Sequence, residues 1–407
     1  MSAAQPAPAP TFIEDWRSFP FTVALQRVAL AADHLRVEWV DGRISPCHFF
    51  WLRDSCPCSA CVHPGTREQI FEVLDAPGDL HVGHAEVDAD GQLRVVWSDA
   101  HVSVYSPGWL RAHVYDEASR LERQAAQHTR RLWHHDLQIA TFDYAAVMSD
   151  DSALLAWLYA ARDQGLTRIV GMPDDEDAVR EVAQRISFLR ETNLGVLWEV
   201  RTKVEEVNSN AYTALELPHH TDLPTREQQP GLQFLHCLSN DATGGDSTFV
   251  DGFAVARALR EEAPEAFALL SQYAVEFRNK ASTSDYRALA PIIGLDARGE
   301  VSEVRVANWL RAPFDLPAEL MPDYYDAYRQ FSALTRDLRF IVRRRLDAGQ
   351  MWCFDNRRTL HARQAFDPSS GLRFLRGCYL DRDELLSRIR VLERTVSASP
   401  LARLALV

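Results

Sequence analysis

The sequence is organised around the stretch Leu217-Pro218-His219-His220-Thr221-Asp222-Leu223-Pro224. In an extended strand every second side chain lies on one face, so His220 and Asp222 are expected side by side. One imidazole and one carboxylate on a common face are two of the three ligands that hold non-haem Fe(II) in oxygenases. The expected third ligand is His361, which follows an apolar run and a polar turn. His219 faces the opposite side and is predicted not to bind metal. The alternative is a surface-loop histidine near an aspartate.

Downstream features favour the metal site. Gly244-Gly245-Asp246-Ser247 follows about one hairpin later. Arg373 lies 12 residues after His361 (373 − 361), as expected for the next strand of a barrel. A buried arginine there would form a bidentate pair with a carboxylate. Arg376 would face the other side of that strand, and Arg363 is the nearest alternative for the role.

Several motifs in a fixed order carry a family resemblance. The chain from Arg185 to Arg382 resembles the 2-oxoglutarate-dependent dioxygenases and, within them, the gamma-butyrobetaine dioxygenase family, and the N-terminal segment resembles the same family. The motifs are Arg185-Ile186-Ser187-Phe188-Leu189-Arg190-Glu191-Thr192, Asn210-Ala211-Tyr212-Thr213, His220-Thr221-Asp222, Gly231-Leu232-Gln233-Phe234-Leu235-His236-Cys237, Gly244-Gly245-Asp246-Ser247 with Val250-Asp251-Gly252-Phe253, Phe354-Asp355-Asn356 through His361, and Gly377-Cys378-Tyr379.

The resemblance implies a mainly β fold with helical inserts. A double-stranded β-helix (jelly roll) would form the catalytic domain, preceded by a small β-rich zinc-binding domain. The expected parts are a disordered tail over residues 1–12, the zinc-binding domain over 13–115, a helical connector over 116–135 and the dioxygenase domain over 136–407.

Hydrophobic periodicity predicts the elements within these parts, and no internal repeat is expected. The expected helices span 151–165, 174–186, 254–272, 322–346 and 383–391. The expected strands lie at 35–40, 93–97 and 167–171, within 195–250 and within 351–380.

The resemblance also implies the cofactors. Fe(II) would be bound by His220, Asp222 and His361. The cosubstrate 2-oxoglutarate would fill two more positions on the metal and O2 the last, with ascorbate as reductant. Arg373 would hold the distal carboxylate of 2-oxoglutarate, with a hydroxyl from Ser247 or Thr248. Oxidative decarboxylation of 2-oxoglutarate would yield succinate, CO2 and an Fe(IV)-oxo species. This species would remove a hydrogen atom from a C–H bond of the substrate and then transfer a hydroxyl group to the same carbon.

The family's substrate carries a trimethylammonium group, which aromatic faces attract through cation–π interaction. The corresponding residues are Trp198, Tyr212 and Tyr379, and simple core packing is the alternative for each. The anionic end of the substrate would be held by Asn210 and Asn308, with Asn208 and Arg311 as further candidates. Leu194 replaces a family tyrosine, and Ser209 replaces one of two paired asparagines.

A second metal site is expected near the N-terminus. Cys56, Cys58 and Cys61 lie within six residues, and closely spaced thiolates repel one another unless a cation holds them. Zn²⁺ takes four ligands in structural sites. The resemblance implies His101 as the fourth ligand, with His63 as an alternative. The other interpretation is three reduced structural cysteines.

Composition limits the partners. The net charge of −13 argues against a nucleic-acid or anionic-membrane partner and is compatible with a small cationic substrate. No apolar run is long enough for a membrane helix, and the start lacks the features of a signal peptide, so a cytoplasmic protein is expected. The family suggests a homodimer.

The predicted function is hydroxylation of gamma-butyrobetaine to L-carnitine. The closest alternative is hydroxylation of another quaternary ammonium compound, such as 2-(trimethylammonio)ethylphosphonate or trimethyllysine. An alternative of another class is a non-catalytic binding module that kept the barrel and the zinc site.

Overall fold

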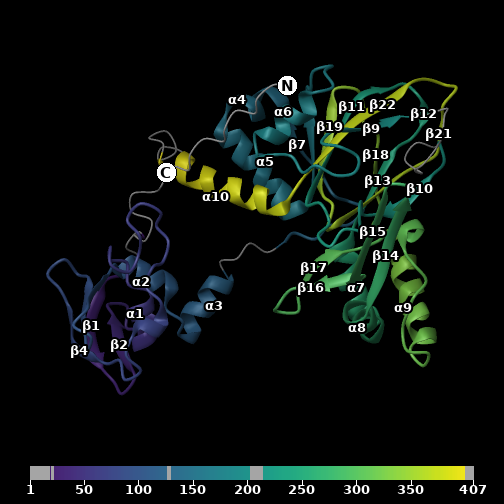
Figure 1. Ribbon diagram of the computed structural model, residues 1–407. Helices are drawn as coiled ribbons and strands as arrows, with labels where there is room; N and C mark the ends of the chain where they lie inside the picture. The colour runs from purple at the N-terminus through teal and green to yellow at the C-terminus, as the bar shows by residue number, and fades with distance from the viewer. Residues whose placement is uncertain (1–18, 20–22, 126–129, 202–213, 399–407) are drawn as a thin grey trace. The chain divides into compact units, whose positions relative to one another are not determined.

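The computed structural model describes residues 19, 23–125, 130–201 and 214–398 (Figure 1). The expected tail over residues 1–12 lies outside them. The chain divides into an N-terminal unit, Met1–His128, and a C-terminal unit, Thr129–Val407.

The N-terminal unit contains two three-stranded antiparallel sheets, β1-β2-β3 and β4-β5-β6. The strands are β1 (Leu25–Leu30), β2 (His34–Trp39), β3 (Ile44–His48), β4 (Val82–Val87), β5 (Leu93–Trp97) and β6 (Val102–Tyr105). The helices are α1 (Phe49–Asp54), the 3-10 turn η1 (Val73–Asp75), α2 (Pro107–His113) and α3 (Glu117–Ala125).

Alternation of side chains builds the core of this unit. On β2, Leu35, Val37 and Trp39 are buried while their neighbours are more exposed, and β5 repeats the pattern. The buried faces of both sheets join one hydrophobic cluster. Burial of alternate residues is what period-two strands produce.

Two sheets form the barrel of the C-terminal unit. One has the order β10-β20-β13-β18 and the other β7-β8-β19-β11-β22-β9. Their strands are β10 (Leu217–His220), β20 (Thr359–Arg363), β13 (Ser247–Asp251), β18 (Val342–Arg344), β7 (Ala140–Asp143), β8 (Leu166–Val170), β19 (Gln350–Asp355), β11 (Leu232–Asn240), β22 (Arg373–Leu380) and β9 (Trp198–Arg201). Three small ladders pair β12 (Thr243–Gly244) with β21 (Phe366–Asp367), β14 (Ala274–Ala281) with β15 (Ser284–Pro291), and β16 (Ile293–Leu295) with β17 (Val301–Val304).

A cluster that includes Phe249, Trp352, Phe354 and Leu375 fills the space between the two sheets. Two packed sheets with helical inserts agree with the expected double-stranded β-helix.

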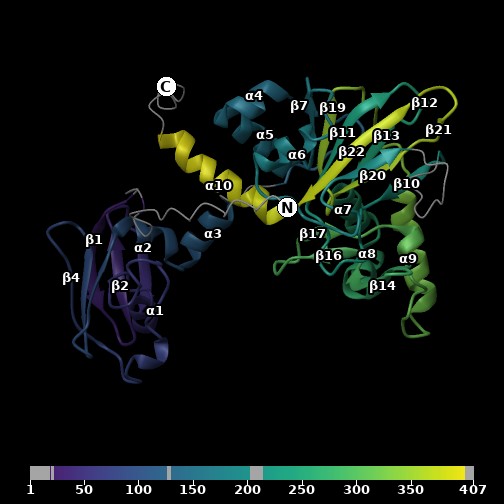
Figure 2. The ribbon, with the colours of Figure 1, turned by 45° about the horizontal axis from the view of Figure 1, so that its top comes forward.

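Helices cover the barrel in two groups (Figure 2). The first packs on the six-stranded sheet and consists of α4 (Tyr144–Ser149), α5 (Asp151–Gln164), α6 (Ala178–Gln184) and α10 (Arg382–Ala398). The second shares a separate cluster with the small ladders and consists of α7 (Gly252–Glu262), α8 (Pro264–Gln272) and α9 (Met321–Leu334). The 3-10 turn η3 (Asn308–Leu310) lies between β17 and α9 in the chain.

Two expected helices differ from the structure at their ends: the one over 174–186 begins only at Ala178, and the one over 383–391 continues to Ala398. Three others differ more. The one over 322–346 is wrong beyond Leu334, because residues 342–344 pair with β13 as β18, where Arg343 forms an ion pair with Asp246 at 2.8 Å. The one over 254–272 is two helices, since Pro264 begins α8. The connector over 116–135 is helical at α3, but residues 130–135 form no helix.

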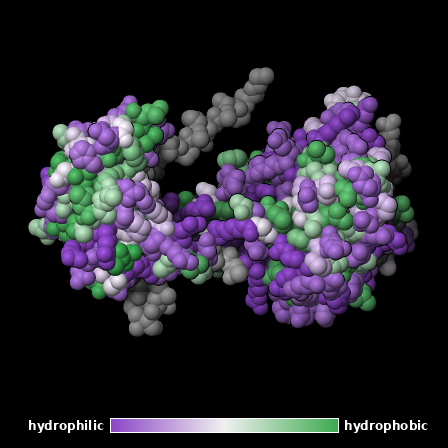
Figure 3. Space-filling view, turned by 90° about the horizontal axis from the view of Figure 1, so that it is seen from below, coloured by the Kyte–Doolittle hydropathy of each residue, from purple (hydrophilic) through white to green (hydrophobic). Residues whose placement is uncertain are grey.

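On the face shown in Figure 3, hydrophilic residues cover most of the C-terminal unit. Among the described residues, no helix combines the length and the apolar character that crossing a membrane requires.

Candidate metal centres

The first site forms where β10 and β20 pair, with His220 directly opposite His361. His220 Nε2 lies 3.3 Å from Asp222 Oδ1, and His361 Nε2 lies 3.7 Å from the same oxygen. One ligand atom from each residue lies within 4.8 Å of the other two. The structure therefore brings together the three side chains that the sequence analysis singled out. Two imidazoles and one carboxylate on one side of a common point fit the facial arrangement of non-haem Fe(II).

The protonation states of these groups suit metal binding. Burial lowers the pKa of His361 to about 3, and the nearby His220 adds to the shift, so His361 is neutral. Burial opposes ionisation of Asp222, but both imidazoles and the Tyr379 hydroxyl hold the pKa of Asp222 well below its ordinary value. The Nδ1 of His220 lies 2.9 Å from the carbonyl oxygen of Pro218. A proton on Nδ1 donated to that oxygen leaves Nε2 free as a ligand.

Asp222 is fixed by side chains from distant strands. Asn356 accepts a hydrogen bond from the Asp222 amide at 2.7 Å and donates one to the Asp222 carbonyl at 3.0 Å. The Tyr379 hydroxyl donates to Asp222 Oδ2 at 2.7 Å. The next residue, Leu223, has a φ of 51°, so the chain turns sharply after Asp222. Sequence reasoning missed the role of Asn356, although its position in the Phe354-Asp355-Asn356 motif was a signal.

Aromatic rings flank both histidines. The ring of Phe354 lies 4.9 Å from that of His361. The ring of Trp309, on η3, lies 4.8 Å from that of His220. Trp309 was also missed, and its position beside Asn308 was the available signal.

Two buried arginines lie near Phe366 at one end of the barrel. Arg373 is 7% exposed and Arg363 is 6% exposed. Arg363 lies opposite Ser247 on β13 and donates to the carbonyl of Leu215 at 2.7 Å. The Nε of Arg373 has no hydrogen-bond partner among the described residues, and the titratable groups that act on its guanidinium are Cys237 and Arg345 rather than a carboxylate. Burial lowers the pKa of Arg373 to about 10, which still leaves it charged at neutral pH. An uncompensated buried cation of this kind suits an anionic ligand.

The expected aromatic cage is described in part. The rings of Trp198 and Tyr379 lie 5.2 Å apart at 32°. Gly377 makes this packing feasible, because a Cβ there would lie 2.5 Å from the Trp198 ring. Tyr212 and Asn210 lie outside the described residues, as do Asn208 and Ser209. Asn308 is exposed on η3, Arg311 ends the same turn, and Leu194 is 40% exposed.

Two other histidines lie near the barrel strands without joining the site. His219 Nε2 lies 3.1 Å from the Thr248 hydroxyl, so both side chains point away from the triad. His236 is fully buried on β11, and neither of its ring nitrogens has a hydrogen-bond partner.

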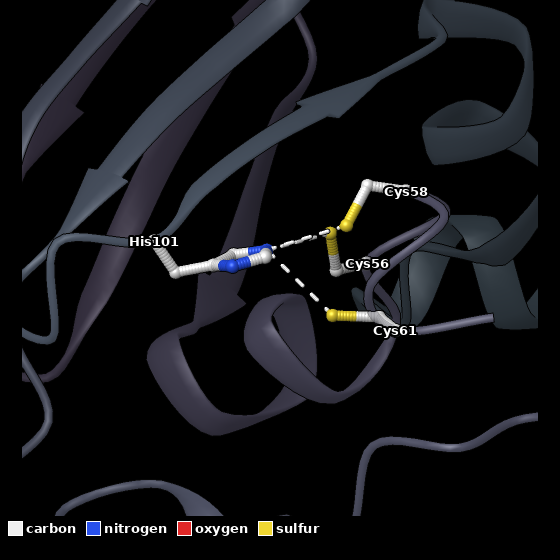
Figure 4. Close-up of side chains that lie close together, drawn as sticks. All are labelled: Cys56, Cys58, Cys61 and His101. Carbon is white, nitrogen blue, oxygen red and sulfur yellow. Dashed lines mark hydrogen bonds between the residues drawn. The ribbon is translucent and has the colours of Figure 1, made fainter.

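The second site is the thiol cluster of the N-terminal unit, where four side chains point toward one another (Figure 4). The Nε2 of His101 lies 3.3 Å from the sulfur of Cys56, and 3.6 Å from the sulfurs of Cys58 and Cys61. The turn before His101 has Ala100 at a φ of 64°. His63, the alternative ligand, is outside the cluster, and its Nδ1 accepts backbone N–H bonds at 3.1 and 3.0 Å.

The thiols of this cluster have unequal acidity. Burial raises the pKa of Cys61 to about 12 and also raises that of Cys56. Hydrogen bonds, first among them one from the Ala60 amide, overcome burial and lower the pKa of Cys58. A cation that binds all three sulfurs would make the remaining thiols ionise. A Cys3His set has no open position, which is typical of structural Zn²⁺ sites.

The barrel and its facial His220, Asp222 and His361 set define an Fe(II)- and 2-oxoglutarate-dependent dioxygenase. Family models match two regions of the chain: "Taurine catabolism dioxygenase TauD, TfdA family" over residues 128–379, and "Gamma-butyrobetaine hydroxylase-like, N-terminal" over residues 27–111. The chain belongs to the TauD, TfdA family and, within it, to the gamma-butyrobetaine dioxygenase family.

Relatives of known name agree with this membership. The chain is 58% identical to a gamma-butyrobetaine dioxygenase of Pseudomonas sp. (strain AK-1), over 94% of this chain and 100% of that protein. It is 32% identical to the human gamma-butyrobetaine dioxygenase, over 90% of this chain and 97% of that protein. It is 29% identical to the mitochondrial trimethyllysine dioxygenase of Gallus gallus, over 89% of this chain and 87% of that protein.

Proposed function

We propose that this dioxygenase hydroxylates gamma-butyrobetaine to give L-carnitine, while 2-oxoglutarate is converted to succinate and CO2; one atom of O2 enters the new hydroxyl group and the other enters succinate. The observation that carries the proposal is the pair of aromatic rings, Trp198 and Tyr379, beside the metal site. A trimethylammonium group donates no hydrogen bond, and each aromatic face attracts it by about 0.5–2 kcal/mol. The high identity to the Pseudomonas enzyme, which is named for this substrate, supports the same choice.

We further propose that His220, Asp222 and His361 hold the Fe(II), which supplies the oxidising chemistry that breaks an unactivated C–H bond. The protein's own residues then have to place the substrate. Arg373 and Ser247 would bind the distal carboxylate of 2-oxoglutarate, because Arg373 is a buried cation without a described anionic partner. Binding both reactants in fixed positions supplies much of the rate that the protein contributes.

The thiol cluster is proposed to hold one structural Zn²⁺ through Cys56, Cys58, Cys61 and His101. Three sulfurs and one imidazole nitrogen converge, and this donor set is one that Zn²⁺ prefers. We also propose ascorbate as the reductant, a cytoplasmic location and a homodimer, as the family resemblance implies. The net charge of −13 supports a cationic substrate over a nucleic-acid or membrane partner.

A second candidate is a different quaternary ammonium substrate, such as trimethyllysine or 2-(trimethylammonio)ethylphosphonate. The observation that favours it is Leu194, a half-exposed aliphatic side chain where the family has a cage tyrosine. One aromatic face fewer weakens the attraction for the ammonium group, so a substrate with other anchoring groups gains relative preference.

A panel assay separates the two candidates. Purified enzyme with Fe(II), ascorbate and 2-oxoglutarate would be tested against each trimethylammonium compound, with succinate and the hydroxylated product both measured. We expect the largest kcat/KM for gamma-butyrobetaine. A larger kcat/KM for another compound would replace the proposed substrate but leave the dioxygenase class unchanged.

A further inference from the structure

Two stretches of the N-terminal unit repeat each other at a spacing of 58 residues (93 − 35). Leu35–Arg53 and Leu93–Arg111 align without a gap. Both contain the pattern Leu-Arg-Val-x-Trp-x-Asp-x3-Ser-x5-Trp-Leu-Arg. The expectation that the chain has no internal repeat is therefore wrong.

The two copies have the same local structure. Each forms an antiparallel three-stranded sheet followed by a short helix, β1-β2-β3-α1 and β4-β5-β6-α2. The Trp39 indole donates to the Ser45 hydroxyl at 3.0 Å, and the Trp97 indole donates to the Ser103 hydroxyl at 2.9 Å. Each central turn contains one residue of positive φ: Gly42 at 83° and Ala100 at 64°.

Contacts between the copies are reciprocal. The helix arginine of each copy pairs with the turn aspartate of the other: Arg53 with Asp99 at 3.3 Å, and Arg111 with Asp41 at 2.8 Å. The equivalent residues Trp51 and Trp109 stack on each other, with ring centroids 5.5 Å apart. A two-fold axis relates two copies when a residue of the first copy contacts a second position in the other copy, and the equivalent residue of the other copy makes the same contact in return. The N-terminal unit therefore has internal pseudo-two-fold symmetry.

The thiol cluster has a counterpart under this symmetry. The thiol cluster combines the segment after α1 with the β5–β6 turn of the second copy. Its counterpart therefore combines the segment after α2 with the β2–β3 turn of the first copy. Adding or subtracting 58 relates Cys56 to Val114, Cys58 to Asp116, Cys61 to Ser119 and His101 to Arg43.

Three of the four counterpart residues, Arg43, Asp116 and Ser119, are joined by hydrogen bonds. Arg43 donates to the Ser119 hydroxyl at 3.2 Å and to a carboxylate oxygen of Glu122 at 2.8 Å. Ser119 donates to Asp116 at 2.8 Å, and so does Ser45 at 2.7 Å. The Arg43 side chain is 19% exposed and Ser119 is 2% exposed. A fixed guanidinium charge thus lies among acceptors where the first site would have a metal ion.

We infer that the N-terminal unit is an internal duplication with two equivalent cation positions, one for a divalent metal ion and one filled by the guanidinium of Arg43. The second position is a latent site for a borderline divalent cation such as Zn²⁺. The order of strands, turn and short helix is the same at both positions, although Ser119 lies in α3 where Cys61 lies in a turn. This inference rests on the zinc site proposed above for the identity of the first cation.

Metal analysis of the full-length enzyme tests the inference. Arg43→His, Val114→Cys, Asp116→Cys and Ser119→Cys together should raise the zinc content from one ion per chain to two. The matched control keeps Arg43 and carries only the three cysteine substitutions; it should remain at one, because the guanidinium blocks the position. A folded four-substitution variant with one zinc overturns the inference. Wild-type enzyme without zinc would instead overturn the proposed zinc site.

A single substitution provides the second measurement should the four-substitution variant not fold. Arg43→Met should lower the unfolding midpoint of the N-terminal unit, because Asp116 and Glu122 lose their shared cation. Arg36→Met is the control, since Arg36 is half exposed and lies 3.5 Å from Glu38 on the strand surface. Equal midpoints for the two variants would overturn the inference that the guanidinium of Arg43 serves as the cation of the second position.

Discussion

The Tyr379 hydroxyl donates a hydrogen bond to Asp222 Oδ2 at 2.7 Å, while the ring of Tyr379 packs 5.2 Å from that of Trp198. One side chain thereby links the proposed substrate cage to a proposed iron ligand. The link is between β22 and the end of β10, two strands of different sheets. A substrate that contacts the Tyr379 ring therefore contacts the group that orients the carboxylate.

Tyr379→Phe separates these two roles. The ring stays in the cage, but the Asp222 carboxylate loses a donor, so we expect kcat to fall by roughly 10–100-fold with little change in the KM for the quaternary amine. Steady-state kinetics at saturating Fe(II) would measure both. Tyr324→Phe is the matched control, because the buried Tyr324 hydroxyl has no hydrogen-bond partner. A raised KM with unchanged kcat would show that the hydroxyl acts on the substrate instead.

Asn356→Ala should weaken both stability and iron binding. Asn356 is fully buried and makes hydrogen bonds to the Asp222 amide and to the carbonyls of Asp222 and Pro230. Removing it leaves buried backbone groups unpaired, which costs about 2–3 kcal/mol. Urea unfolding and ferrous titration would measure the two effects. The control is Asn193→Ala, because Asn193 is exposed and contacts Arg226. Equal losses of stability and of iron affinity in both variants would show that Asn356 does not hold Asp222 in place.

Local pattern was enough for part of this site. The period of two predicted His220 and Asp222 side by side, but β10 ends at His220 and Asp222 lies in the bend after the strand. The order of distant motifs pointed to His361. The hydrogen bonds from Asn356 to the Asp222 backbone and the packing of Trp309 beside His220 depend on how separate strands and turns pack. No short sequence pattern encodes that packing. The wrong helix over 322–346 has the same origin, since pairing of β18 with β13 overrides a basic, helix-like composition.

Arg373→Met should raise the KM for 2-oxoglutarate. A charge-assisted hydrogen bond in a buried site contributes about 1.5–3 kcal/mol, so we expect an increase of roughly 10–100-fold. Arg376→Met is the control on the same strand, because Arg376 faces away and lies 3.4 Å from Glu176. An unchanged KM in Arg373→Met, with a raised KM in Arg363→Met, would show that Arg363 binds the distal carboxylate of 2-oxoglutarate instead.

Removal of the proposed zinc should unfold the N-terminal unit before the barrel. Without a cation the buried thiols of Cys56 and Cys61 stay protonated, because burial raises the pKa of both. Calorimetry with chelator should therefore show a separate transition at lower temperature. Cys58→Ala should reproduce it with zinc content near zero, whereas Cys47→Ala, a buried thiol of the same unit outside the cluster, should keep its zinc. A single unchanged transition after complete zinc loss would exclude a stabilising metal.

His236 should make the barrel sensitive to acid. Burial lowers the pKa of His236 to about 4, against the opposing effect of Asp174 and Asp175, whereas an unfolded histidine titrates near 6.5. Between these values the unfolded chain binds more protons, so the contribution is complete above pH 6.5 and is lost as pH falls toward 4. The loss amounts to at most about 3 kcal/mol.

His236→Leu tests this account, because it removes the titrating group and also two unpartnered ring nitrogens. We expect equal or greater stability at pH 7.5, since no hydrogen bond is broken, and a smaller fall in the free energy of unfolding between pH 6.5 and 4. Urea unfolding at a series of pH values would measure it. His84→Leu is the control, because His84 is exposed and lies 3.5 Å from Glu86. If His236→Leu kept the wild-type pH profile, the acid sensitivity would have to come from other buried groups.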